Sequence, residues 1–373
     1  MIWLYAGLLL VVMSGAYLVY LGWYFWWEGR HTTGLAYYGQ PLAERRALKR
    51  RVRRYSRPAL PLVRALARAT RSSRTMPTFD FAGVSGPPRV SSPDVFARAT
   101  RYVPRPEDVF VATQMRCGTT WMQQVVYAIV TRGRGDFDGH RGHLYAVSPW
   151  IEAINTVSID EAPLVGDPPT RIVKTHLPAD LCPYHERAKY IYVARHPVNC
   201  FASIVEFNRS MIGPLLPPLD ALADWFCSDR MYWRPWPRHV AGWWELAERR
   251  DNVLFVHFEE MTRDFEAVRD RVARFLECPL MPDEARRVDE CCSFRYMKDH
   301  EETFEMAPPT MFSVTGGQFL ARGTARRHED VTPEIRERIL EYCRESLSQS
   351  AYPAGRFYAD LAAADRRPVV VTS

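Results

Sequence analysis

VFVATQMRCGTTW, residues 109–121, joins an apolar run to a glycine-containing turn and to the start of an amphipathic helix. This order predicts a buried strand, a loop and a helix. The N–H groups at the helix start, the helix dipole and the hydroxyls of Thr119 and Thr120 together suit the binding of an anion. An ordinary strand-to-helix turn remains the alternative for this segment taken alone.

The loop lacks the lysine of a Walker A phosphate loop. When the two are aligned on Gly118, Thr119 occupies the lysine position and Thr113 occupies the position of the first glycine. We therefore expect an anion-binding loop that places no lysine on a γ-phosphate.

Short apolar runs alternate with amphipathic stretches from about residue 100 onward, which is typical of an α/β domain with a central, mostly parallel sheet flanked by helices. The predicted strands are 109–112, 171–174, 190–194 and 253–256. The predicted helices are 119–131, 198–208, 238–250, 263–276 and 333–347. We assign the domain to residues 96–350 and a C-terminal tail to residues 351–373.

Residues 2–27 contain no charged side chain and carry aromatic residues at both ends. The stretch is long enough to cross a bilayer, which takes about 20 residues, so we predict a transmembrane anchor over residues 1–27. A buried helix of the domain is the alternative. Because Lys and Arg follow the stretch and none precedes it, the N-terminus is expected outside and the bulk of the chain in the cytoplasm.

The basic charge of the chain is local. Residues 45–74 hold 12 Lys/Arg and no Asp/Glu, which leaves 37 basic against 43 acidic residues elsewhere, although the net charge is +6. This distribution does not indicate a nucleic-acid-binding surface. With its prolines, the segment 28–95 is predicted to be a basic, Pro-rich juxtamembrane linker that either faces solvent or lies against anionic headgroups.

The cysteines and histidines indicate no metal site. The eight cysteines include no CxxC pair and no regular spacing, which rules out a disulfide scaffold and a zinc ribbon. His140 and His143 have a ligand-like spacing, but no Cys or His cluster accompanies them.

Four segments resemble, in the same order, those of the PAPS-dependent sulfotransferases, PAPS being 3′-phosphoadenosine 5′-phosphosulfate. They are RCGTTW at 116–121 for the phosphosulfate loop, KTHLP at 174–178 for the catalytic base, YVARHP at 192–197 with Ser203 for the 3′-phosphate, and FLARG at 319–323 for the C-terminal nucleotide loop. The likeness extends over residues 105–345. It implies a P-loop-like sulfotransferase domain, PAPS as co-substrate, no metal, and a membrane-anchored, bacterial member of the family.

The resemblance implies that His176 is the general base and that Lys174 and Arg116 stabilise the leaving phosphate. The residues themselves agree with these roles. His176 follows an apolar strand, and imidazole titrates in a range suited to removing a hydroxyl proton. Lys174 lies two residues earlier, so both side chains point to one face of an extended strand.

The resemblance also implies a donor site. Thr119 and Thr120 would bind the 5′-phosphate, with Arg195, Ser203, Arg322 and Gly323 on the 3′-phosphate and Trp121, Phe258 and Phe294 around the adenine. The full set of expected cofactor-binding residues is Arg116, Cys117, Gly118, Thr119, Thr120, Trp121, Arg195, Ser203, Phe258, Phe294, Arg322 and Gly323. Three of them depart from the family pattern, which usually has lysine at Arg116, serine at Cys117 and often tyrosine at Phe258.

The acceptor side is less defined. Five tryptophans lie between residues 225 and 244 and either form an apolar lid over a hydrophobic acceptor or belong to the core: Trp225, Trp233, Trp236, Trp243 and Trp244. Together with the anchor they favour a lipid-like or membrane-partitioning alcohol, while a soluble carbohydrate or phenol remains open.

Two other functions compete with sulfuryl transfer. A P-loop nucleotide kinase or hydrolase of related fold is disfavoured by the missing Walker lysine, by the lack of an evident magnesium-binding aspartate, and by His176. A catalytically inactive membrane scaffold that binds nucleotide is the third possibility, against which the pairing of His176 with Lys174 argues.

Overall fold

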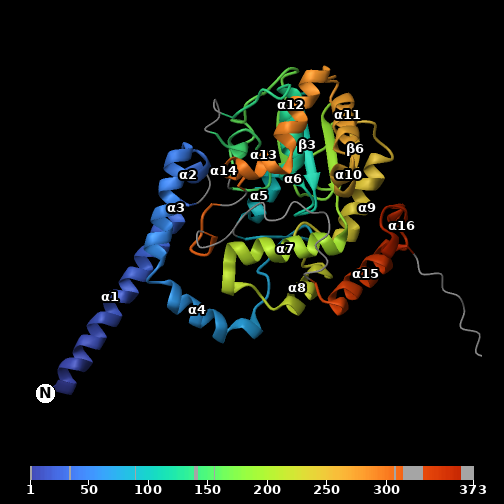
Figure 1. Ribbon diagram of the computed structural model, residues 1–373. Coiled ribbons are helices and arrows are strands. Elements are labelled where there is room, and N and C mark those ends of the chain that lie inside the picture. The colour runs from blue at the N-terminus through green and yellow to red at the C-terminus, as the bar shows by residue number, and fades with distance from the viewer. Residues whose placement is uncertain are drawn as a thin grey trace, which may run out of the picture.

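A parallel sheet with strand order β4-β3-β5-β6 organises the catalytic domain (Figure 1). The computed structural model describes residues 2–32, 35–88, 90–137, 142–154, 156–305, 308–313 and 331–362. The strands of the sheet are β3 (Asp108–Thr113), β4 (Arg171–Thr175), β5 (Lys189–Ala194) and β6 (Val253–His257). The register places Val111 beside Lys174 on one side and beside Ile191 on the other. The predicted fold class is therefore confirmed.

The strands are buried on both faces because alternate side chains pack into two different cores. Phe110, Val173 and Tyr192 belong to the core that residues of α7, α8, α9 and α15 complete. Val111, Ile172 and Val193 belong to the core that residues of α6, α11 and α12 complete. The sheet is thus covered by helices on each face, as a near-continuous apolar strand pattern requires.

The predicted strands and most predicted helices lie within a few residues of the observed ones. The helices of the domain are α5 (Pro93–Thr100), α6 (Thr119–Val130), α7 (Pro197–Ile212), α8 (Leu219–Phe226), α9 (Trp236–Ala247), α10 (Phe258–Arg263), α11 (Phe265–Phe275), α12 (Pro282–Cys292), α13 (Phe294–Asp299), α14 (Glu301–Phe304), α15 (Pro333–Leu347) and α16 (Ala354–Phe357). The helix expected over 263–276 is preceded by a separate helix. Asp264 has an extended φ and its carboxylate accepts the N–H of Ala267, so it caps α11 and separates it from α10.

Helix α1 (Ile2–His31) has two parts with different surroundings. Side chains from Trp3 to Val19 are mostly exposed, and Figure 1 shows this part projecting away from the domain. This stretch is about 26 Å long at 1.5 Å per residue, close to the roughly 30 Å thickness of the hydrocarbon core. Tyr24 and Trp27 are instead buried. The helix is long and apolar enough to cross a membrane, and its last third is part of the folded body.

The prediction that residues 28–95 form a linker is wrong. They contain α2 (Leu35–Tyr38), α3 (Leu42–Ser56), α4 (Leu60–Ala69) and a hairpin of β1 (Phe79–Phe81) and β2 (Val84–Gly86). Leu48 and Val52 of α3 pack with Tyr24 and Trp27 of α1 in a third core cluster. Arginine and proline content indicated a solvated segment, but one apolar face of α3 was sufficient for packing.

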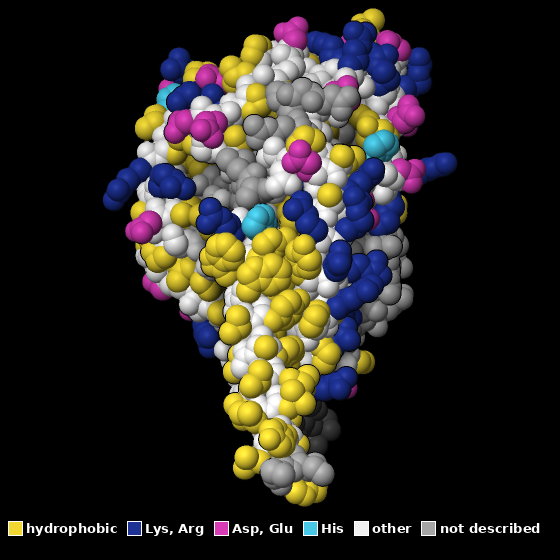
Figure 2. Space-filling model, turned by 90° about the vertical axis from the view of Figure 1, so that its left-hand side faces the viewer, with side chains coloured by type: hydrophobic (Ala, Val, Ile, Leu, Met, Phe, Trp, Pro, Cys, Tyr) yellow, Lys and Arg dark blue, Asp and Glu magenta, His cyan; other side chains and the backbone are white. Residues whose placement is uncertain are grey.

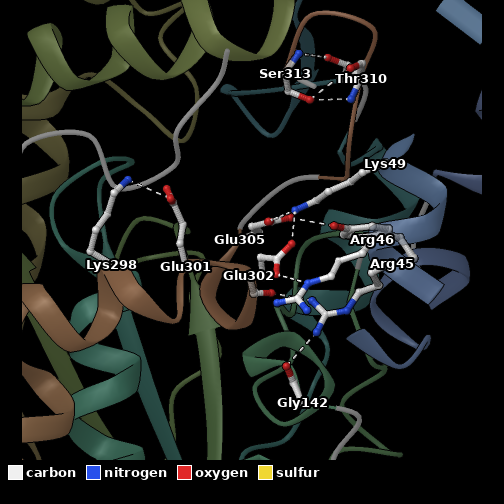
Figure 3. A network of polar contacts seen from close by, with 11 residues as sticks. Arg45, Arg46, Lys49, Gly142, Lys298, Glu301, Glu302, Glu305, Thr310 and Ser313 are labelled. Carbon is white, nitrogen blue, oxygen red and sulfur yellow. Dashed lines mark hydrogen bonds and ion pairs between the residues drawn. The ribbon is translucent and has the colours of Figure 1, made fainter. Parts of the chain in front are cut away.

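Helix α3 also contacts a segment more than 250 residues away (Figure 3). The buried guanidinium of Arg45 donates to the carbonyl oxygens of Glu302 (2.6 Å) and Gly142 (2.9 Å). Arg46 and Lys49 pair with the carboxylates of Glu302 and Glu305. A buried charge is tolerated here because its donors reach two carbonyl groups and acidic side chains lie close by.

Replacement of Arg45 by methionine is expected to lower the free energy of unfolding by about 3 kcal/mol, because two buried carbonyl groups would lose a charged donor. Arg50 is an exposed arginine of the same helix, so Arg50→Met should change stability by less than about 0.5 kcal/mol. Denaturant unfolding of the full-length protein in detergent compares the two variants. Equal stability of both would contradict the assigned contribution of Arg45.

Candidate active site

The loop between β3 and α6 has the geometry of an anion cradle. Arg116 and Gly118 both have positive φ values, 63° and 103°, on either side of Cys117. A side chain at position 118 would also collide with Phe258, whose Cδ2 would lie 2.7 Å from the added Cβ. Glycine is therefore required twice over, by the backbone conformation and by the close approach of Phe258. The loop places the N-terminus of α6 at the carboxyl edge of the sheet.

His176 lies directly after β4 and is buried, with 1% of its surface exposed. Its Nδ1 is 2.7 Å from the carbonyl oxygen of Thr113, at the end of β3. Because a carbonyl only accepts, Nδ1 carries the proton of the neutral ring and Nε2 keeps its lone pair. Burial and the nearby Lys174 hold the pKa of His176 well below its usual range, so the ring is neutral at neutral pH, with the Nε2 lone pair free of a proton.

Lys174 lies on the same face of β4 and is completely buried. Its Nζ is 3.1 Å from the hydroxyl of Tyr145 and 3.6 Å from the centre of the Trp150 ring. The pKa of Lys174 is lowered to about 7, mainly by burial, with Glu152 opposing the shift and the positive charge of Arg116 adding to it. The ammonium is thus held beside aromatic faces at the site rather than in solvent.

The carboxylate of Glu152 binds the end of β4, next to Lys174 and His176. This residue was not predicted from the sequence. Its Oε1 accepts the backbone N–H of His176 and the indole N–H of Trp150, each at 2.6 Å, and its Oε2 accepts the hydroxyl of Thr175 at 3.0 Å. Burial raises the pKa of this carboxyl. The only signal in the sequence was a lone acid in the apolar stretch 147–154.

The threonines of the loop connect it to His176. Thr119 Oγ1 is 2.6 Å from Thr113 Oγ1, which in turn is 3.2 Å from His176 Nδ1. Thr119 and Thr120 are both buried at the start of α6. The phosphate loop and the histidine are therefore parts of one hydrogen-bonded unit.

Arg195 and Ser203, both expected at the 3′-phosphate, each lie against Arg116, which was expected at the leaving phosphate. Arg195, at the end of β5, donates to the carbonyl oxygen of Arg116 at 3.0 Å and lies over the ring of Phe258. The Nε of Arg116 is 3.3 Å from the hydroxyl of Ser203 on α7. Within the described residues the buried Nε of Arg195 has no hydrogen-bond partner, so this guanidinium has an unused donor in the site.

Two of the aromatic residues expected around the adenine, Trp121 and Phe258, lie next to each other beside the loop. Trp121 donates its indole N–H to the carbonyl oxygen of Cys292 at 2.8 Å and has its ring centre 5.6 Å from that of Phe258. Phe294, the first residue of α13, is 42% exposed. Arg322 and Gly323 lie outside the described residues. Cys117 is buried with its sulfur 3.7 Å from that of Cys200, so it serves packing.

Most of the tryptophan-rich segment belongs to the core. Trp225, Trp236 and Trp243 are buried there, while Trp244 packs against it and is half-buried. Trp236 donates to the carbonyl oxygen of Arg195 and Trp243 to that of Leu177, which ties α9 to the ends of β5 and β4. Trp233 alone of these five has its ring close to that of His176, at a centre-to-centre distance of 4.8 Å.

Comparisons with known proteins agree with this geometry. The profile of the sulfotransferase domain family matches residues 106–351. Sulfotransferase 1C2 of Rattus norvegicus is 27% identical over 268 residues, which cover 69% of this chain and 88% of that protein. The 3-alpha-hydroxysteroid sulfotransferase of Cavia porcellus is 26% identical over 249 residues, which cover 65% of this chain and 85% of that protein.

Solved structures show the same fold. Mouse sulfotransferase SULT7A1 complexed with PAP aligns with a TM-score of 0.59 at 20% identity, covering 75% of this chain and 96% of that one. Retinol dehydratase in a complex with retinol and PAP aligns with a TM-score of 0.59 at 19% identity, covering 77% and 95%. Because the family profile extends over most of the chain, from β3 to the end of α15, this protein belongs to the sulfotransferase family and its chemistry is sulfuryl transfer.

Proposed function

We propose that the enzyme transfers the sulfuryl group of PAPS to the hydroxyl of a hydrophobic, membrane-partitioning alcohol. The observation that carries the chemistry is the placement of Lys174 and His176 on one face of β4, with His176 hydrogen-bonded to Thr113 at the end of β3, where the loop begins. Solved relatives of the same fold are complexed with PAP, the product that PAPS leaves behind, which supports PAPS as the donor.

The proposed reaction assigns one role to each group. Nε2 of His176 takes the proton of the acceptor hydroxyl as the acceptor oxygen bonds to sulfur, and the bond between sulfur and the phosphate oxygen of PAPS breaks. Negative charge develops on the departing phosphate, where Lys174 and Arg116 supply positive charge. The products are the sulfate ester and PAP, with the proton on His176.

Binding of the donor is assigned to the loop and to the residues around it. The N–H groups of 117–120 and the hydroxyls of Thr119 and Thr120 would hold the 5′-phosphate. Arg195 and Ser203 would hold the 3′-phosphate, together with Arg322 and Gly323. Trp121, Phe258 and Phe294 would enclose the adenine. The loss of one hydrogen bond at Phe258, where relatives often have tyrosine, is offset in this proposal by stacking.

Titration of PAP into the full-length protein in detergent tests the donor. We expect tight binding without a metal, and a loss of about 10- to 100-fold in affinity in Arg195→Ala, because a charged hydrogen bond contributes about 1.5–3 kcal/mol. Arg187→Ala, which removes an exposed arginine near β5, is the matched control and should bind PAP normally. A preference for ATP with magnesium over PAP would overturn the proposal.

The proposed membrane topology rests on α1 and α3. The exposed apolar stretch from Trp3 to Val19 would span the bilayer, and Figure 2 shows Lys and Arg side chains gathered beside α1 where it meets the body. Those charges favour the cytoplasm for the catalytic domain. Among relatives, one is named a hydroxysteroid sulfotransferase and one is complexed with retinol, which supports a hydrophobic acceptor.

A further inference from the structure

A cavity of about 450 Å³ lies between α4, α7, the short helix η4 (Gly213–Leu215) and α8. Its lining combines polar groups with apolar side chains, among them Val205, Leu216 and Leu222. Three guanidinium groups also line it, those of Arg68, Arg71 and Arg209. Its lining shares no residue with the expected donor site, and Arg209 lies six residues beyond Ser203 on α7, about 9 Å along the helix axis.

The three arginines carry uncompensated positive charge. They are exposed, and in the described part of the chain none of their side chains forms a hydrogen bond or an ion pair. The nearest acids of α8 are engaged elsewhere, because Asp220 and Asp224 both pair with Arg338 of α15. The cavity therefore combines apolar walls with a cationic rim, which suits an amphipathic anion.

The position of α4 places this cavity at the level where α1 leaves the body. Pro58, two residues before α4 begins, accepts the hydroxyl of Tyr17 at the end of the exposed apolar part of α1. Figure 1 shows α4 running from that point along the lower edge of the body toward α8, across the direction in which α1 projects. Leu66 of α4 is 56% exposed, as expected of a helix that lies in a membrane interface.

We propose that this cavity binds an anionic phospholipid, with the headgroup phosphate on Arg68, Arg71 and Arg209 and the first carbons of the lipid against Val205, Leu216 and Leu222. Guanidinium groups bind phosphate oxygens bidentately, and the cytoplasmic leaflet supplies anionic lipid at its surface. The site rests on the proposed membrane anchoring and adds to it a specific lipid contact. It fixes the orientation of the catalytic domain on the bilayer.

Photo-crosslinking in lipid nanodiscs tests the site. The full-length protein is reconstituted in phosphatidylcholine with a minor fraction of photoactivatable phosphatidylglycerol, and labelled peptides are identified by mass spectrometry. We expect labelling of residues 205–222, reduced about 10-fold or more in the triple variant Arg68→Gln, Arg71→Gln, Arg209→Gln. The matched control Arg50→Gln, Arg51→Gln, Arg54→Gln removes the same charge from exposed positions of α3 and should keep the labelling.

Other outcomes would overturn the proposal. Equal loss of labelling in both triple variants would indicate general attraction to the anionic surface instead of a site. Competition by inorganic phosphate at millimolar concentration would assign the cavity to a soluble anion. Affinity for PAP is measured on the same samples. Normal PAP binding without labelling rejects the lipid site alone, whereas absence of PAP binding in the unsubstituted protein rejects the proposed donor.

Discussion

Replacement of His176 by alanine is expected to lower the rate of sulfuryl transfer by roughly 10²- to 10⁴-fold, the range typical of a general base. The reason is the hydrogen bond between Nδ1 and the carbonyl oxygen of Thr113, which leaves Nε2 as the proton acceptor. Affinity for PAP should stay close to that of the unsubstituted protein, since the hydroxyl that the base deprotonates belongs to the acceptor and not to PAP.

The measurement is transfer of labelled sulfate from PAPS to a panel of hydrophobic alcohols in a single turnover, with PAP binding determined in parallel. His300→Ala, at an exposed histidine at the end of α13, is the matched control and should transfer at the normal rate. A His176→Ala variant that transfers sulfate normally would remove the histidine from the chemistry. A variant that loses PAP binding as well would indicate that the ring supports the loop.

The sheet and its loop could be predicted because their signals are local. Apolar runs such as Val109–Ala112 are strands with both faces buried, and Gly118 marks the left-handed turn that follows. The two-residue spacing of Lys174 and His176 likewise predicted that their side chains lie on the same face of one strand. The position and type of a helix or strand can be predicted from its own residues when the spacing of its apolar side chains shows which face is buried.

The parts that were missed depend on distant partners. Arg45 appeared to be a solvated basic residue, but its two carbonyl partners lie 97 and 257 residues along the chain. Glu152 comes from a stretch without regular secondary structure, so no periodicity indicated that its carboxylate faces His176. The tryptophans of 225–244 gave an ambiguous signal, because aromatic residues at helical spacing fit both a lid and a core. In the structure all five belong to the core or pack against it, and Trp233 also contacts His176.

Replacement of Lys174 by methionine is expected to raise the stability of the protein while lowering its rate of transfer. Burial lowers the pKa of Lys174 to about 7 from its ordinary value of 10.5. Below pH 7 the ammonium is charged in both the folded and the unfolded state, and the folded state bears the full cost of desolvating it. A methionine of similar volume avoids that cost, which is on the order of a few kcal/mol.

The pH dependence separates this effect from better packing. Between about pH 7 and 10.5 the unfolded state binds one more proton at Lys174 than the folded state, so the stability of the unsubstituted protein rises with pH. The advantage of Lys174→Met should therefore be largest below pH 7 and shrink steadily above it. Thermal unfolding at about pH 6 and about pH 9 measures the change. Lys189→Met, at a partly exposed lysine paired with Glu277, is the control and should show no such trend.

Proton uptake on donor binding provides a second, independent test of Lys174. A phosphate beside Lys174 favours the charged ammonium, so PAP should raise the pKa of this group and take up a proton when it binds above about pH 7. Calorimetry in two buffers of different ionisation enthalpy measures that uptake. The uptake should disappear in Lys174→Met. Proton uptake that persists in the variant would assign the titrating group elsewhere, whereas its loss together with the slower transfer would place the ammonium on the leaving phosphate.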